Sequence, residues 1–260
     1  MKQNHFYIAY PGNKRKEIQN IIDNTDLQNI DTIIEPYCGT SALSVYLYHF
    51  HPRGKEFKYI INDHNKHLID LYNIAKDENE FNNFIDDVNE SVFDDDNNFI
   101  SKDEYFNLIN EDTLKAWFIK NKFYNIRVGM YPMRKSIPFI NNKNLMNDFI
   151  RNSNLEIIND DGVKIVEQYK NNINALIFLD PPYINLCNDF YQLGGGNIYE
   201  YLYNHDKNMF KCLLVSILNE NWIVNLLFRN YNILKYSKKY ETSKKEVTHL
   251  LISNREFTDH

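Results

Sequence analysis

Residues 31–50 read DTIIEPYCGTSALSVYLYHF, and this stretch decides the fold class. The apolar run DTII at 31–34 predicts a buried strand, EPYCGT predicts a tight turn, and the apolar spacing that follows predicts an amphipathic helix. A second strand is predicted for FKYII at 57–61, and a helix with apolar residues between Leu68 and Ala75 comes after it. Strand, helix and strand at this spacing form a βαβ unit, which implies a parallel sheet.

The segment from 77 to 150 has a different character. It is polar and rich in Asn and Asp, and it shows helical patches near 80–90, 103–110 and 112–123 but no convincing strand. We therefore predict an inserted, mostly helical domain over residues 77–150.

After residue 150 the alternation of strand and helix resumes. Buried strands are predicted for LEII (155–158), ALIFL (175–179) and CLLVSI (212–217), and a helix for 220–229. The closing stretches YNILKYSKKYE (231–241) and EVTHLLISN (246–254) are joined by a polar turn, which predicts an antiparallel edge hairpin. Residues 1–76 and 151–260 are thus predicted to form one α/β domain with a mainly parallel sheet.

Composition narrows the function classes. The chain has 260 residues and is 43% hydrophobic, which supports an ordinary core, and its net charge of −6 excludes a broadly cationic nucleic-acid coat. Any phosphate contact must therefore come from local patches. No apolar run approaches the roughly 20 residues of a membrane helix, and the start lacks the pattern of a signal peptide.

Three widely spaced cysteines, Cys38, Cys187 and Cys212, form no CxxC pair. We interpret them as reduced thiols of an intracellular, cytoplasmic protein, with neither a disulfide framework nor a metal site.

The sharpest motif is Asp180-Pro181-Pro182-Tyr183, directly after the predicted strand ALIFL. Because proline cannot continue a strand ladder, the motif lies at the carboxyl end of the strand, where open α/β sheets bind ligands. A carboxylate and a proline carbonyl accept hydrogen bonds and a tyrosine offers a stacking face. Together they suit a planar ring that bears an exocyclic amino group. The alternative is a simple proline turn in which Asp180 caps a helix.

Two further features accompany it. In EPYCGTS (35–41), Gly39 permits a tight turn and close approach of a ligand, while Thr40 and Ser41 are good helix N-caps. An ordinary β–α turn is an equal alternative for this segment. Asp63 ends the second strand, where an acidic residue commonly holds ribose hydroxyls, although it could also cap the next helix.

Together these motifs resemble the Dam-type DNA adenine-N6 methyltransferases. The similarity runs through YPGNK (10–14), EPYCGTS, NDHNKHLIDLYNI (62–74) and LDPPY (179–183), and KKEVTHLLISN (244–254) is similar to the family's last strand. The order of cofactor motif, recognition domain and DPPY motif is also the family's own. The resemblance implies a Rossmann-like S-adenosylmethionine-dependent methyltransferase fold. It also implies methyl transfer from S-adenosylmethionine to a flipped adenine at specific DNA sites.

The resemblance also implies residue roles. Asp180 and the Pro181 carbonyl would accept the N6–H bonds of the flipped adenine, and Tyr183 would stack on its ring, with Pro182 completing the motif. Lys14 and Tyr10 would line the pocket of cofactor and target. The remaining cofactor-binding residues would be Glu35, Tyr37, Gly39, Thr40, Ser41, Asp63, Asp161 and, again, Asp180.

The mechanism needs neither a metal nor a covalent intermediate. An adenine amino group is a weak nucleophile because its lone pair is delocalised into the ring, so two acceptors on N6 stabilise the charge that grows in the transition state. The sulfonium methyl must lie in line with N6, at about 3–3.5 Å. Since N6 is buried in the duplex, the base must first be extruded.

DNA contacts are expected from Arg127, Arg134 and Lys135 in the recognition segment and from Lys238 and Lys239 in the closing hairpin. A solvated lysine-rich turn is an equal alternative for the hairpin, and Gly194–Gly196 is expected to be a hinge or a plain surface loop. The expected partners are double-stranded DNA and, where the enzyme serves in restriction-modification, a companion restriction endonuclease.

Two positions depart from the family pattern. Ser41 stands where the family usually has a second glycine, and Gly162 stands where it commonly has an aromatic residue, so a wall of the slot for the cofactor's adenine is missing or supplied elsewhere. A non-catalytic DNA-binding pseudomethyltransferase, which has lost cofactor affinity through Ser41 and Gly162, is therefore one alternative. An RNA adenine-N6 methyltransferase is the other, because the sequence has no direct reader of the 2′-hydroxyl group. The target sequence is left open.

Overall fold

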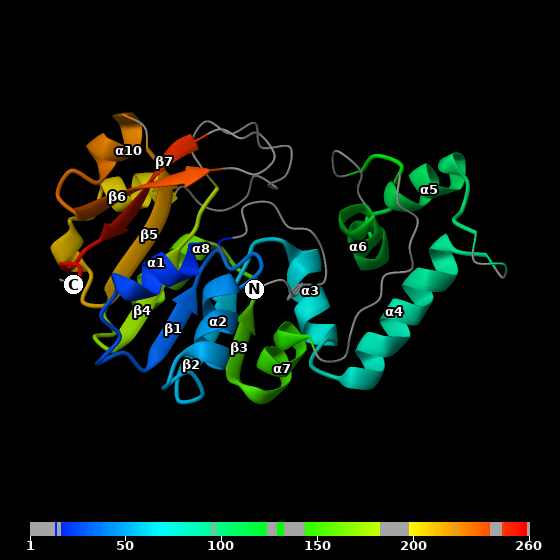
Figure 1. The fold of residues 1–260 in the computed structure, drawn as a ribbon, viewed down its shortest axis with the longest axis horizontal. Coiled ribbons are helices and arrows are strands. Elements are labelled where there is room, and N and C mark those ends of the chain that lie inside the picture. The colour runs from blue at the N-terminus through cyan, green and yellow to red at the C-terminus, as the bar shows by residue number, and fades with distance from the viewer. Residues whose placement is uncertain are drawn as a thin grey trace. The chain divides into compact units, whose positions relative to one another are not determined.

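The computed structural model describes residues 14, 17–94, 96, 98–123, 129–132, 144–182, 198–220, 222–239 and 246–258 (Figure 1). The chain divides into two compact units. One comprises residues 14–64 and 154–260 and contains the sheet. The other comprises residues 1–13 and 65–153, and its described elements are helical.

The sheet has seven strands in the order β3-β2-β1-β4-β5-β7-β6. The strands are β1 (Thr32–Glu35), β2 (Lys58–Asn62), β3 (Asn154–Ile158), β4 (Ala175–Leu179), β5 (Leu213–Asn219), β6 (Asn232–Lys239) and β7 (Glu246–Ser253). The first five pair in parallel, whereas β7 runs antiparallel to both β5 and β6. The predicted α/β fold, with a mainly parallel sheet and an antiparallel terminal hairpin, is confirmed.

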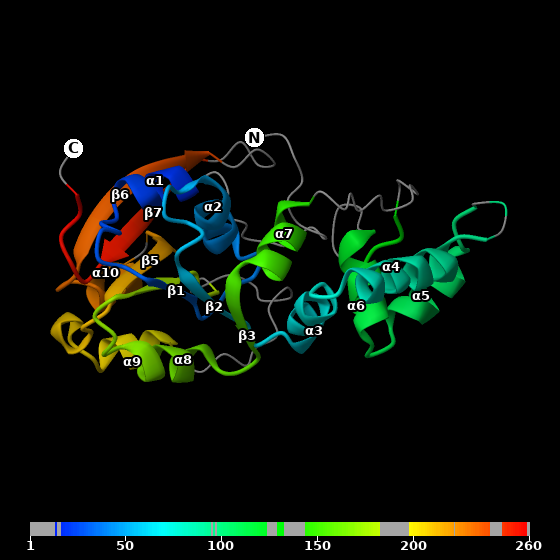
Figure 2. The same ribbon diagram turned by 90° about the horizontal axis from the view of Figure 1, so that it is seen from below.

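Helices cover both faces of this sheet. They are α1 (Ile18–Asp23), α2 (Ala42–Phe50), α8 (Gly162–Tyr169), α9 (Ile198–Tyr203) and α10 (Trp222–Leu227), with a short 3-10 turn η1 (Lys207–Met209). Figure 2 shows α1 and α2 on one face and α8 and α9 on the other. Buried helix positions such as Leu43, Leu47 and Val166 supply the apolar contact that holds these layers together.

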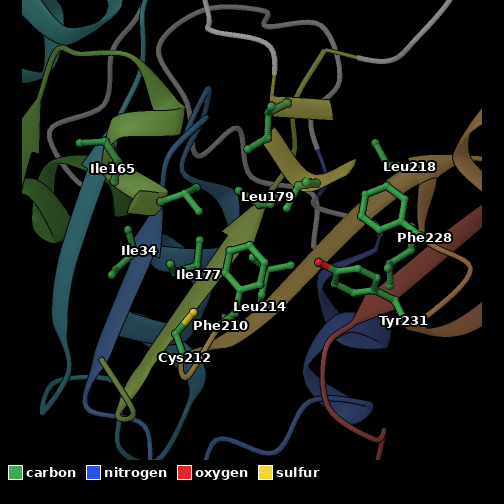
Figure 3. Close-up of a cluster of buried hydrophobic side chains, with 14 of the residues drawn as sticks. Ile34, Ile165, Ile177, Leu179, Phe210, Cys212, Leu214, Leu218, Phe228 and Tyr231 are labelled. Atoms are coloured by element: carbon green, nitrogen blue, oxygen red, sulfur yellow. The ribbon is translucent and has the colours of Figure 1, made fainter. Parts of the chain in front are cut away.

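The core on the α8–α9 side is continuous across the sheet (Figure 3). Ile34 of β1, Ile177 of β4 and Leu214 of β5 lie in it together with Ile165 of α8. All five residues of β4 are buried, as expected for a central strand covered on both faces. This packing fixes the point at which β4 ends and the DPPY motif begins.

The helical unit contains α3 (Lys66–Ile74), α4 (Glu78–Val92), α5 (Lys102–Ile109), α6 (Leu114–Lys122) and α7 (Leu145–Asn152). The three predicted helical patches are therefore confirmed, and the pairing found in the described part is one isolated bridge between Phe93 and Phe99. The unit is larger than the predicted insertion because it includes α3. Its role in target recognition stays a prediction. None of the helices in the described ranges has the length and apolar character that crossing a membrane requires.

The sheet has a topological switch point between β1 and β4. From β1 the chain builds outward through β2 and β3, and β4 then returns to the other side of β1. Ligands of open α/β sheets bind at the carboxyl ends of the strands beside such a point. The EPYCGTS turn follows β1 and Asp180 follows β4, so both motifs lie at this edge.

Candidate active site

Lys14 and Asp180 form the central contact at the switch point. The Lys14 Nζ lies 2.6 Å from Oδ1 and 2.7 Å from Oδ2 of Asp180, so one ammonium bonds both carboxylate oxygens. Only 5% of the Lys14 side chain and 20% of the Asp180 side chain are exposed. The fold thus brings together two residues that are 166 positions apart in the chain.

The charge of Asp180 depends on its neighbours. Burial raises the pKa of this carboxyl, and the positive charge and hydrogen bond of Lys14 act in the opposite direction. Glu17 raises the pKa further and Lys238 lowers it, both through their charges. Lys14 therefore helps to keep Asp180 ionised and able to accept hydrogen bonds.

The prolines fix the chain beyond Asp180. Pro181 is buried, and the hydroxyl of Tyr199 in α9 donates to the Pro182 carbonyl at 2.8 Å. This hydrogen bond anchors the second proline of the motif to α9.

The side chain of Glu35 binds the N-terminal turn of α2. Its Oε1 accepts a 2.9 Å hydrogen bond from the backbone N–H of Ser44, in the first turn of α2. Burial raises the pKa of Glu35 to about 7, and the charge of Asp180 adds to the effect. Glu35 was predicted to bind the cofactor. The structure gives it the additional role of capping α2, which shapes the turn that it precedes.

The turn itself is held against the end of β2. Gly39 has a positive φ of 46°, and its N–H donates to Oδ2 of Asp63 at 3.0 Å. The alternative that Asp63 caps the following helix is wrong, because Asn65 occupies the N-cap of α3 and accepts from the Leu68 N–H. Asp63 therefore holds the turn after β1 against the end of β2.

Asn62 is a structural residue that the sequence did not reveal. Its fully buried amide donates to the carbonyls of Pro36 and Asp160, at 2.8 and 3.0 Å, and accepts from the Asp160 N–H. It thereby joins the loops that follow β1, β2 and β3. No local pattern signals these contacts, since Asp160 is 98 residues away.

Tyr37 occupies the space that Gly162 leaves open. A Cβ added at Gly162 would lie 2.4 Å from Cζ, 2.7 Å from Cε1 and 2.8 Å from the hydroxyl oxygen of Tyr37. The ring of Tyr37, which comes from the turn after β1, therefore fills the space beside Gly162. Burial, followed by the charge of Asp161, raises the pKa of Tyr37 well above its usual value.

Asp161 and Ser41 are both helix N-caps. The Asp161 side chain accepts from the Val163 N–H at 2.8 Å at the start of α8. Ser41 precedes α2 with a left-handed φ of 46° and makes no side-chain cap hydrogen bond. The predicted cap at Ser41 is confirmed in position, while Thr40 lies buried beside it.

Several predicted site residues lie outside the described part of the chain, so their roles stay predictions. They are Tyr10, Tyr183, Arg127, Arg134, Lys135, the hinge Gly194–Gly196 and the side chain of Lys239.

Lys238 has an internal partner. Only 17% of its side chain is exposed, and it forms an ion pair with the buried carboxylate of Glu17. Glu17 also accepts from Tyr236 and His249. A DNA contact was predicted for Lys238, whereas its link to Glu17 and His249 has no signal in the sequence, because these contacts join positions more than 200 residues apart. A DNA contact by Lys238 stays a prediction.

The candidate site lies in an α/β fold with a mainly parallel seven-stranded sheet, at the switch point between β1 and β4. Residues 10–123 match the family of D12 class N6 adenine-specific DNA methyltransferases, and the Dam-type resemblance is confirmed over this segment.

Solved structures and curated proteins were also compared. The rRNA methyltransferase aviRa from Streptomyces viridochromogenes aligns over 97% of this chain and 90% of its own, with 12% identity and a TM-score of 0.43. The type IIG restriction endonuclease BpuSI aligns over 98% of this chain but 26% of its own, with 12% identity and a TM-score of 0.39. No curated protein matches the sequence.

Proposed function

We propose that the chain is a site-specific DNA adenine-N6 methyltransferase that uses S-adenosylmethionine and acts on an extruded adenine in double-stranded DNA. The observation that carries the proposal is the Lys14–Asp180 pair at the switch point of the sheet, next to the Gly39 turn. The family match over residues 10–123 supports DNA adenine as the substrate. We place the reaction inside the cell, and a companion restriction endonuclease remains part of the proposal.

The edge of the sheet fits the cofactor. Among the described residues the buried hydroxyl of Tyr37 has no hydrogen-bond partner, and its ring lies against the bare backbone of Gly162. An aromatic face with an open polar atom suits a purine ring. Asp63 and Asp161, at the ends of the adjacent loops, would serve the ribose and the adenine. When bound, S-adenosylmethionine supplies an electrophilic sulfonium methyl group.

The residues of this chain would act mainly by orientation and electrostatics. The Asp180 carboxylate and the Pro181 carbonyl would each accept one N6–H of the extruded adenine, which favours a localised lone pair on nitrogen. Lys14 would keep Asp180 ionised despite its burial, since a protonated carboxyl is a poorer acceptor. The buried thiol of Cys38, whose pKa is raised by burial, is not suited to nucleophilic catalysis.

The test is transfer of a tritiated methyl group from S-adenosylmethionine to matched substrates. Double-stranded DNA, RNA of the same sequence and protein alone are compared, and the labelled base is identified after digestion. The proposal predicts label in N6-methyladenine of DNA. Label in RNA alone would favour the RNA alternative, and cofactor binding without any transfer would favour the pseudomethyltransferase.

A further inference from the structure

A buried polar cluster lies directly before α1 and ties it to the closing hairpin. The carboxylate of Glu17 is only 4% exposed and accepts from His249 Nδ1 at 2.7 Å and from the Tyr236 hydroxyl at 2.6 Å. The Lys238 ammonium donates to its other oxygen. Tyr236 and Lys238 belong to β6 and His249 to β7, so one side chain is held by two strands.

The same residue holds the main chain of Lys14. The backbone N–H of Glu17 donates to the Lys14 carbonyl at 2.7 Å, and the N–H of Ile18 donates to it at 3.1 Å. Lys14 in turn reaches Asp180 with its side chain. The β6–β7 hairpin is therefore linked to the carboxylate of Asp180 through the side chain and backbone of Glu17 and then the backbone and side chain of Lys14.

Burying the carboxylate of Glu17 costs free energy that its hydrogen bonds and ion pair must offset. A carboxylate removed from water needs several donors to stay ionised, and Glu17 has three, which lower its pKa to about 2 despite burial. An apolar residue at this position would bury as well at lower cost. What an apolar residue could not supply is a fixed orientation relative to both strands of the hairpin.

We propose that Glu17 is a positioning residue, which is clamped by His249, Tyr236 and Lys238 and thereby holds Lys14 against Asp180. The catalytic importance of this role rests on the proposed function, whereas its test, the titration of Asp180, does not. The rival explanation is that Glu17 acts on Asp180 only through its negative charge and does not position Lys14. Among the described residues, the charged groups that act on Asp180 or are acted on by it are Lys14 and Glu17 near α1, Glu35 of β1 and Lys238 of β6.

The substitution Glu17→Asp separates positioning from charge. It retains the negative charge but shortens the side chain by one methylene, so the bonds to β6 and β7 are lost. If Glu17 positions Lys14, the ammonium shifts from Asp180 and the pKa of Asp180 rises toward its value in Lys14→Met. If Glu17 acts by charge alone, or only supports the fold, the pKa of Asp180 in Glu17→Asp stays at or below the wild-type value.

The pKa of Asp180 can be read without any catalysis. Aspartate labelled with ¹³C at the carboxyl carbon is titrated by NMR in the full chain, and Asp180→Asn assigns the signal. The matched control is Glu220→Asp, because Glu220 forms a more exposed ion pair with Lys235 of the same strand β6 and its charge is not among those that act on Asp180. We expect the control to leave the titration of Asp180 unchanged.

A second variant covers the case in which Glu17→Asp does not fold. Tyr236→Phe removes one donor to Glu17 and changes no charge, so a rise in the pKa of Asp180 supports positioning and an unchanged pKa overturns it. In methyl transfer, Glu17→Asp should lower kcat by about 10- to 100-fold with little change in the KM for cofactor. If the wild type transfers no methyl group although the titration responds, the proposed function fails while the positioning role stands.

Discussion

The contact between Tyr37 and Gly162 provides a direct test of the cofactor slot. In Gly162→Ala the new Cβ would lie 2.4 Å from Cζ of Tyr37, whereas ordinary contact begins at 3.4 Å, so the ring must move by about 1 Å. The helix itself does not suffer, because Gly→Ala within a helix is favourable by up to about 1 kcal/mol. The substitution therefore displaces the ring without an inherent cost to α8.

Displacement of the ring should weaken cofactor binding. An aromatic contact is worth roughly 0.5–1.5 kcal/mol, so we expect the Kd for S-adenosylmethionine to rise by about two- to tenfold. Isothermal titration measures the Kd, and thermal unfolding shows whether the variant keeps its fold. A stable Gly162→Ala variant with the wild-type Kd would refute the assignment of Tyr37 to the slot.

A double variant tests the physical cause. In a Tyr37→Leu background the clashing ring atoms are absent, and Gly162→Ala should then change the Kd very little. If the two substitutions instead weaken binding additively, the effect of Gly162→Ala does not pass through Tyr37.

The other predictions concern single residues of the same edge. The pKa of Glu35 is raised to about 7 from an ordinary 4.5. Below pH 4.5 the carboxyl is protonated in both the folded and the unfolded state, so the raised pKa costs no stability there. As the pH rises to 7 the unfolded state ionises first, and the wild type loses stability. In urea unfolding, Glu35→Gln should therefore gain up to about 3 kcal/mol relative to wild type across this window, and a constant difference would contradict the reasoning. Ser41→Gly should raise the free energy of unfolding by about 0.5–1 kcal/mol by relieving a left-handed φ, and a loss of stability would contradict this. Lys14→Met should move the acid limb of methyl transfer to higher pH, because Asp180 loses the charge that lowers its pKa, and a pH profile of unchanged shape would be evidence against that role.

Much of the fold could be predicted because its signals are local. Apolar runs such as ALIFL at 175–179 coincide with β4 residue for residue, and the helical spacing after EPYCGT produces α2. The DPPY motif could be placed at a strand end because proline stops the ladder. The domain boundary was predicted at 77, whereas the compact units divide at 65. The apolar face of α3 predicts a buried helix, but it does not indicate which unit buries it.

The arrangement of the candidate site was harder to predict from the sequence. The glycine at 162 is evident in the sequence, but the Tyr37 side chain that fills its space is 125 positions earlier. Packing between such distant segments leaves no periodic signal. Glu17 reads as an ordinary polar residue beside a basic stretch, and its partner His249 lies 232 positions away. Such contacts follow from the folded sheet and not from any local pattern.

The central claim is that Asp180 and the Pro181 carbonyl accept the amino hydrogens of an extruded adenine. Its most direct test is the single-turnover rate of methyl transfer to DNA by Asp180→Ala, measured together with the Kd for S-adenosylmethionine. The account predicts a rate lowered by at least about 10²–10³-fold with a largely unchanged Kd. A rate equal to that of the wild type would contradict it.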